Sequence, residues 1–175
     1  MKVLVTYYTQ TGNTRKVAEA IYGEIAEAKE IKELAAVENL EAHDLSFIGF
    51  PIMAFGAAKP AKDFLAAHAA GRKVALFITH ASPEASEHLE QWLAACKEAA
   101  ADTELVGVFN CQGELAESIA GLLANSDDPQ MRAFADGRSE TLGQPDETRL
   151  EKARAFAREI MEKVRGQAPS EGAGS

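Results

Sequence analysis

The sequence contains little that would link it to an oxidising compartment or to a membrane. Cys96 and Cys111 are its only cysteines, too few for a disulfide framework, which fits a reducing environment. No apolar run approaches the roughly 20 residues that span a bilayer. The first residues lead straight into a strand, without the basic and apolar segments of a signal peptide. We therefore expect a cytoplasmic protein with no membrane span.

Basic residues are also scarce. The chain has 18 Lys and Arg against 27 Asp and Glu, a formal net charge of −9. Binding a nucleic-acid backbone needs a basic face, so we expect no nucleic-acid partner. The acidic charge would favour a protein partner with a basic docking patch, through long-range steering, although solubility alone also explains it. His43, His68 and His88 are dispersed and show no metal-ligand spacing, so no metal site is expected.

The 175 residues fit one domain, over residues 1–165, followed by a flexible tail over 166–175. The tail contains Gly, Ser, Ala and Pro with almost no apolar bulk. We expect the protein to be a monomer.

Short apolar runs alternate with amphipathic stretches, the pattern of repeated βαβ units around a parallel sheet. Strands are predicted over residues 3–8, 30–34, 45–50, 73–79 and 104–110. Helices are predicted over 13–27 and 60–69, from Ser82-Pro83-Glu84 onward, and over 114–124 and 146–164. Pro51 is expected to end the third strand, residues 125–129 to break a helix, and residues 133–145 to form a loop.

These elements predict an α/β fold with a doubly wound, five-stranded parallel sheet of order 2-1-3-4-5 and helices on both faces. In such a sheet the ligand crevice lies at the carboxyl ends of the strands, between strands 1 and 3. The loops expected to line it are residues 9–14, 51–56 and 79–82, with residues 111–113 nearby.

The loop between the first strand and the first helix is Thr9-Gln10-Thr11-Gly12-Asn13-Thr14. A helix N-terminus offers unpaired N–H groups and the positive end of the helix dipole, and threonine hydroxyls add further donors. Gly12 permits close approach of the backbone to an anion. The pattern predicts a phosphate site built from neutral donors. The alternative is an ordinary capping turn with Thr11 or Asn13 as the N-cap.

In this setting the loop resembles the Ser/Thr-x-Thr-Gly-x-Thr phosphate loop of flavodoxins. The similarity continues through Asp44-Leu45-Ser46-Phe47-Ile48-Gly49-Phe50-Pro51-Ile52-Met53, through residues 73–79 and through residues 106–113, and spans residues 2–164. The resemblance implies a flavodoxin-like fold, FMN as cofactor and an electron-carrier function.

The resemblance also implies which residues bind FMN. The phosphate would lie on Thr9, Gln10, Thr11, Gly12, Asn13 and Thr14. The flavin ring would lie against Pro51, Ile52, Met53, Ala54, Phe55 and Gly56, against Thr79, His80 and Ala81, and beside Cys111, Gln112 and Gly113. Stacking on Phe55 is expected, whereas Ile52 and Met53 are equally explained as core residues.

One part of the flavodoxin pattern is missing. Many flavodoxins carry a Tyr near residues 79–82 that covers the outer face of the flavin, and this chain has none there. The ring would be more exposed, or His80 or the segment after the fifth strand would cover it. His80 is equally explained as a surface residue with no role, and Cys111 as an inert buried thiol.

An electron carrier is the leading functional prediction, with no catalytic residues of its own. The alternatives are an NAD(P)H-dependent or quinone-type reductase on the same fold, and a flavodoxin-like interaction module that has lost FMN. A response-regulator receiver has the same strand order, but it needs acidic residues where this chain has Tyr8-Thr9-Gln10 and Phe50-Pro51.

Overall fold

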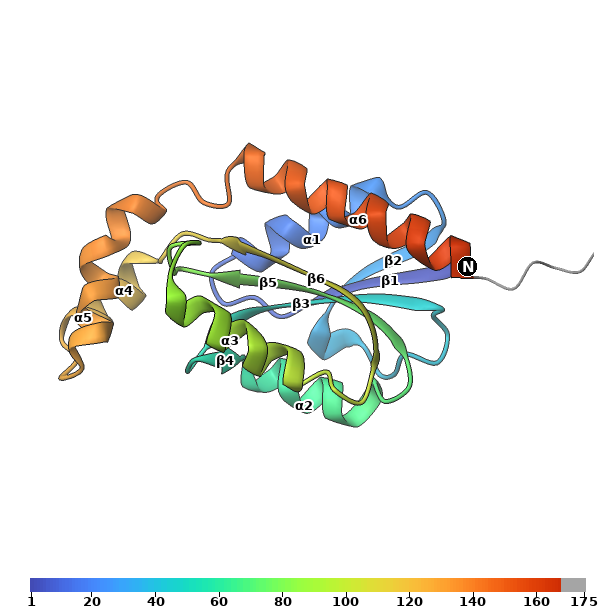
Figure 1. Ribbon diagram of the computed structural model, residues 1–175, viewed down its shortest axis with the longest axis horizontal. Helices are drawn as coiled ribbons and strands as arrows, with labels where there is room; N and C mark the ends of the chain where they lie inside the picture. Colours follow the sequence, from blue (N-terminus) through green and yellow to red (C-terminus); the bar gives the residue numbers. More distant parts are fainter. Residues whose placement is uncertain (168–175) are drawn as a thin grey trace, which may run out of the picture.

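A parallel β-sheet forms the centre of the computed structural model, which describes residues 1–167 (Figure 1). Its strand order is β2-β1-β3-β5-β6, and a short β4 pairs antiparallel with β3. The strands are β1 (Lys2–Tyr7), β2 (Ala28–Glu33), β3 (Leu45–Met53), β4 (Gly56–Ala57), β5 (Lys73–His80) and β6 (Glu104–Gln112). Because β5 and β6 are the predicted fourth and fifth strands, the predicted fold and strand order are confirmed.

Helices cover both faces of this sheet. In Figure 1, α1 (Asn13–Glu24) and α6 (Glu147–Gln167) lie on one face, and α2 (Lys59–His68) and α3 (Glu87–Glu98) on the other. Helices α4 (Glu117–Ala124) and α5 (Pro129–Asp136) pair with each other at one end of the molecule, and short 3₁₀ turns cover Leu34–Ala36 and Gly137–Thr141. The predicted tail starts at residue 166, but α6 continues through Gln167; the rest of the tail lies outside the described residues.

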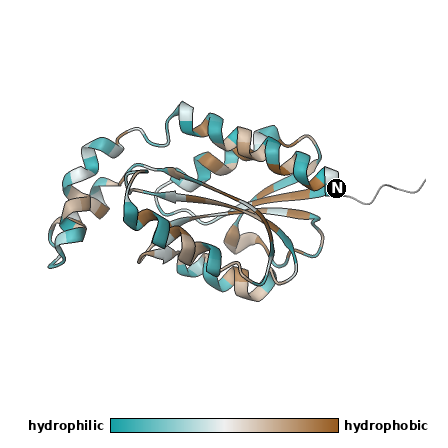
Figure 2. Cartoon of the chain, in the orientation of Figure 1, coloured by the Kyte–Doolittle hydropathy of each residue, from teal (hydrophilic) through white to brown (hydrophobic). Residues whose placement is uncertain are grey.

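Two apolar cores result from the alternation of side chains along the strands. Val3, Val5, Phe47 and Phe77 point towards α1 and α6, whereas their neighbours Leu4, Ile48, Leu76 and Ile78 point towards α2 and α3. In Figure 2 the central strands are accordingly brown, and the outer faces of the helices carry most of the teal. Within residues 1–167, no helix combines the length and the apolar character that crossing a membrane requires.

The sequence predicted that Pro51 ends the third strand, and this prediction is wrong. Strand β3 continues to Met53, and Pro51 is the register partner of Thr79 on β5. The pairing of β3 with β1 stops at Gly49, so beyond that residue β3 has a parallel partner on one side only. A residue without an N–H donor is tolerated at such an edge.

Helix α3 begins at Glu87, five residues after the predicted start at Ser82. Residues 82–86 instead form a turn in which the N–H of Ser86 donates to the carbonyl of Pro83 at 3.1 Å. The guanidinium of Arg149, at the start of α6, holds Glu84 of this turn at 2.8 Å. The side chain of Arg149, which is distant in the sequence, therefore fixes this turn.

The predicted loop over residues 133–145 is wrong, because α5 and the 3₁₀ turn at Gly137–Thr141 occupy most of it. Asp128 is the N-cap of α5 and accepts a hydrogen bond from the N–H of Gln130 at 2.8 Å, and Pro129 is the first helical residue. The Asp-Pro pair that marked a helix break also starts the next helix.

We predict that Gly49→Ala destabilises the fold. A Cβ at Gly49 would fall inside the ring of its buried register partner Phe77, which would have to leave its rotamer. Overpacking of this kind costs about 1–3 kcal/mol. Gly23→Ala is the matched control, because a Cβ in that part of α1 meets nothing within 4 Å, so stability should rise by about 0.5–1 kcal/mol. Urea unfolding measures both free energies, and a fully stable Gly49→Ala variant would contradict this account.

Candidate functional site

The main cavity lies where β1, β3 and β5 end, at the crevice that the sheet order predicts. Its volume is about 420 Å³, within the range of about 300–1,000 Å³ that is typical of small-molecule sites. Its walls come from the loop after β1, the turn between β3 and β4, the loop after β5, and the segment from Gly113 into α4 and α5. Only one of the residues that line this cavity is charged, Glu114.

The N-terminus of α1 opens onto this cavity without a side-chain cap. Gly12 is the N-cap residue, with φ of 96°, and its conformation favours glycine. The alternative in which Thr11 or Asn13 caps the helix is therefore wrong. Thr9 stabilises the loop instead, because its hydroxyl accepts a hydrogen bond from the N–H of Gly12 at 3.0 Å. The first-turn N–H groups of α1 are thus available to an anion.

Thr14 links this helix to the sheet. Its hydroxyl is buried and lies 2.8 Å from the hydroxyl of Thr79 on β5. Each hydroxyl carries one proton, and the bond between them uses only one, so the second proton remains available to a ligand. The pair both fixes the loop over residues 9–14 on β5 and can contribute a donor to the cavity.

Asn13 joins the same loop to the segment after β6. Its amide donates to the carbonyl of Glu114 at 2.8 Å, and its side chain packs where a Cβ of residue 113 would be. Position 113 therefore requires glycine, because Asn13 occupies the space that a side chain would need. The contact makes Asn13 a positioning residue for two walls of the cavity.

The turn between β3 and β4 is conformationally strained. Met53 pairs with Gly56, and the two central residues, Ala54 and Phe55, have φ of 50° and 66°. A two-residue hairpin turn with both φ values positive normally contains Asn and Gly. Backbone strain of this kind is often found at ligand sites. The ring of Phe55 packs on Trp92 of α3 at a centroid distance of 5.4 Å, while 44% of the residue stays exposed.

His80 is buried, so its interpretation as a surface residue is wrong. Its Nδ1 lies 3.0 Å from the carbonyl of Ser82, and its Nε2 lies 3.0 Å from the amide of Asn110. The carbonyl can only accept, so Nδ1 carries a proton. Nε2 faces Oδ1 of Asn110, which likewise can only accept. Burial lowers the pKa of the imidazole and outweighs these two hydrogen bonds, which raise it.

Cys111 lies beneath the cavity rather than in its wall. Burial raises the pKa of its thiol to about 12, so the thiol stays protonated at neutral pH. Because the thiolate is the reactive form, this favours the interpretation as an inert core cysteine. Among residues 1–167, no group of three or more His, Cys, Asp and Glu side chains could hold a metal ion.

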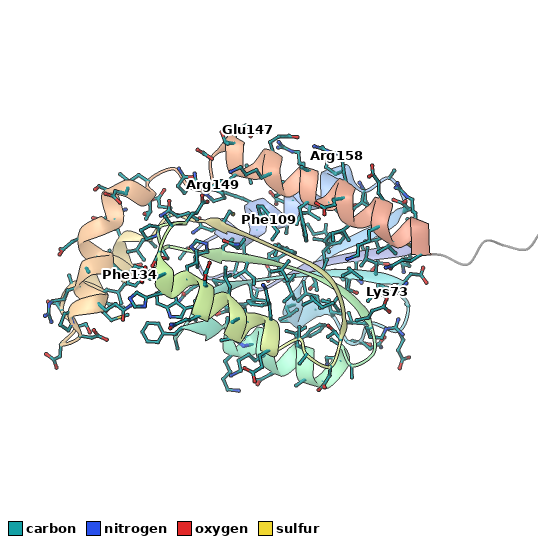
Figure 3. All side chains as sticks on the ribbon, in the orientation of Figure 1. Lys73, Phe109, Phe134, Glu147, Arg149 and Arg158 are labelled. Atoms are coloured by element: carbon teal, nitrogen blue, oxygen red, sulfur yellow. The ribbon has the colours of Figure 1, made fainter. Side chains whose placement is uncertain are left out.

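Helices α4 and α5 form a further wall, from the segment after the fifth predicted strand that was one of the alternatives for covering the flavin. Their apolar side chains Ile119, Leu122, Leu123, Met131 and Phe134 line the cavity together with Trp92. Trp92 lies between Phe55 and Phe134, at centroid distances of 5.4 and 5.8 Å, and Figure 3 shows Phe134 at α5 on the side of α3. The helix predicted over residues 114–124 corresponds to α4, whereas α5 was not predicted.

Most of the predicted site residues meet in the main cavity. Those that line it are Thr9, Gln10, Thr11, Asn13, Thr14, Pro51, Ile52, Met53, Ala54, Phe55, Thr79, His80, Ala81 and Gly113. Gly12, Gly56 and Cys111 do not line it, and Gln112 lines a neighbouring cavity instead. The predicted loops thus converge, with Gln112 facing away from the others.

Fold and cavity together define a doubly wound α/β protein with an uncapped helix N-terminus at its topological switch point. Residues 4–158 match the family described as flavodoxin domain. The chain is 31% identical over 174 residues to the flavodoxin-like domain-containing protein BilS of Clostridioides difficile, covering 94% of this chain and 98% of that protein. The chain therefore belongs to the flavodoxin domain family.

Solved structures show the same fold. Oxidised flavodoxin 2 from Bacillus cereus superposes with a TM-score of 0.60 at 19% identity, covering 93% of this chain and 99% of that one. A flavoprotein from Lactobacillus acidophilus, solved in complex with FMN, has a TM-score of 0.50 at 23% identity, covering 62% of this chain and 92% of that one.

We predict that Ala54→Gly stabilises the protein, by about 0.5–1 kcal/mol, because glycine adopts a positive φ without steric cost. Ala155→Gly is the control: this exposed residue lies inside α6, where glycine should cost about 1 kcal/mol. Urea unfolding of the two variants should give changes of opposite sign. Equal destabilisation by both would show that the turn at Ala54 is not strained.

We also predict that stability falls as the pH drops below about 6.5, the pKa of histidine in an unfolded chain. The lowered pKa of His80 means that the unfolded state binds more protons there in this range. His80→Gln should therefore flatten the dependence of the unfolding free energy on pH between about 7 and 5. His88→Gln, at an exposed position on α3, should retain the wild-type slope. An unchanged slope in His80→Gln would contradict the assignment.

Proposed function

We propose that this protein binds one FMN in the main cavity and transfers electrons between partner proteins. The observation that carries the proposal is that one cavity joins an uncapped helix N-terminus to an apolar opening. FMN has matching ends, a phosphate dianion and a flat aromatic ring. When bound, FMN would supply the ability to accept and release electrons, and the protein would set its position and environment.

The phosphate end would lie on the loop Thr9–Thr14. Backbone N–H groups at the start of α1 and the hydroxyls of Thr9 and Thr11 are the available donors, with the second proton of the Thr14–Thr79 pair. The positive end of the helix dipole favours the anion. Since this wall has no Lys or Arg, the charge would be balanced by neutral, fixed dipoles.

The ring end would lie between the strained turn and the wall from α4 and α5. Ile52, Met53 and Phe55 offer apolar surface from one side, and Leu123 and Phe134 from the other. Thus α4 and α5 would replace the aromatic cover that residues 79–82 lack. The FMN complex of the Lactobacillus flavoprotein and the family membership support this assignment.

The charge of the cavity favours a carrier over a reductase that uses NAD(P)H. A pyridine dinucleotide brings a pyrophosphate, for which basic side chains are common partners. None of the residues that line the main cavity is Lys or Arg, and Glu114 adds a negative charge. With a net charge of −9, a redox partner with a basic docking patch would be attracted. Fast reduction of the FMN form by NADPH alone would favour the reductase instead.

We predict tight, stoichiometric binding of FMN and much weaker binding of riboflavin, which lacks the phosphate. Thr11→Val should weaken FMN binding by about ten- to a hundredfold, because a hydrogen bond to a charged group contributes about 1.5–3 kcal/mol. Thr148→Val, at an exposed site on α6, is the matched control and should bind normally. Fluorescence titration of the flavin measures both ligands, and equal affinity for riboflavin would contradict the phosphate assignment.

A further inference from the structure

A second cavity lies next to the main one, on the far side of Trp92 and Phe134. We call it the side cavity; its volume is about 290 Å³, at the lower end of the range for small-molecule sites. Its walls are the turn that precedes α3, the start of α3, the end of β6, α5 and the 3₁₀ turn after α5. Ala81, Ser82, Trp92 and Phe134 line both cavities, so a wall one residue thick separates them.

Gln112 supplies a fixed hydrogen-bond acceptor in this cavity. The residue is 7% exposed, and its Nε2 donates to the carbonyls of Ala81 and Ser82 at 3.4 and 3.3 Å. Two carbonyls can only accept, so the orientation of the amide is determined and Oε1 faces away from them. Within residues 1–167, Oε1 receives no hydrogen bond, although it is not sealed from solvent. An accessible acceptor in the lining of a cavity can receive a hydrogen bond from a ligand that carries an O–H or N–H.

Two hydroxyls that line the side cavity are already bonded within the protein. The hydroxyl of Thr141 donates to the carbonyl of Arg138 at 2.7 Å and accepts from the N–H of Leu115 at 3.0 Å. The hydroxyl of Ser82 donates to the carbonyl of Pro83 at 3.2 Å. Glu140 is the one carboxylate in the lining, and no Lys or Arg contributes. The side chains of Ser86, His88 and Gln130 also line the cavity. A ligand therefore meets Oε1 of Gln112, apolar walls, one carboxylate and no Lys or Arg, which disfavours an anion.

The aromatic walls define the shape of the ligand. Trp92 and Phe134 lie 5.8 Å apart at an interplanar angle of 38°, and His88 stacks on Trp92 at 6.2 Å. Offset aromatic packing at such separations favours a flat ring as the next neighbour. We propose that the side cavity binds a small, uncharged planar aromatic molecule that donates an O–H or N–H to Oε1 of Gln112.

This binding does not depend on the proposed cofactor. If FMN occupies the main cavity, however, a ring in the side cavity lies across the Trp92–Phe134 wall from it, and can therefore alter its environment.

The test compares two probes on the FMN-loaded protein by isothermal titration calorimetry. 2-Naphthol carries the O–H donor and 2-methoxynaphthalene does not. We expect 2-naphthol to bind about tenfold more tightly, because only 2-naphthol can donate a hydrogen bond to Oε1 of Gln112. Gln112→Leu should make the two affinities equal. The protein has a single Trp, so its one indole N–H resonance should shift when 2-naphthol binds.

Two further variants locate the binding independently of Gln112. Ala133→Phe fills the side cavity from α5 and should abolish binding of both probes, whereas Ala124→Phe, exposed on α4 outside both cavities, should not. Equal affinity of the two probes in the wild type, no binding, or binding that survives Ala133→Phe would overturn the proposal. So would displacement of FMN by 2-naphthol, seen in the flavin absorbance. Failure to bind FMN at all would refute the proposed function instead, and leaves the probe comparison intact on the unloaded protein.

Discussion

The site depends on one constraint, the open N-terminus of α1 at the carboxyl end of β1. A parallel sheet with a right-handed crossover places that helix end at the switch point, and Gly12, at φ of 96°, gives it no side chain with which to satisfy its own N–H groups. The surrounding contacts hold it in place. Thr14 fastens it to β5 through Thr79, and Asn13 fastens it to the segment after β6. An anion is the partner that such an end accepts best.

The fold and the position of the loop before α1 could be predicted because their signals are local. Apolar runs give the strands, and Thr and Gly residues before an amphipathic helix give the loop. The hairpin after Pro51 could not be predicted, since it depends on the pairing of β3 with β1 stopping at Gly49. Helix α5 was missed because Asp128-Pro129 has the same composition whether it ends one helix or starts another. The contact of Trp92 with Phe134 joins residues of α3 and α5, and no local sequence pattern predicts it.

Helix α5 contributes to the walls of both cavities, and α4 contributes to the wall of the main cavity. Their apolar side chains close the main cavity where residues 79–82 offer no large aromatic residue, and the back of the same wall forms part of the side cavity. Arg149 contributes from α6, since its ion pair with Glu84 at 2.8 Å fixes the turn that both cavities adjoin (Figure 3). The environment of the proposed cofactor would therefore depend on this segment.

The central claim is that the backbone at the start of α1 holds the phosphate of the cofactor. The most direct measurement is a set of ¹H–¹⁵N correlation spectra of the labelled protein during titration with FMN and with riboflavin. The account predicts that the amide resonances of residues 11–15 shift strongly with FMN and much less with riboflavin, because hydrogen bonds to phosphate deshield those protons. Shifts confined to the ring end, at residues 52–55, with no difference between the two ligands at residues 11–15, would contradict it.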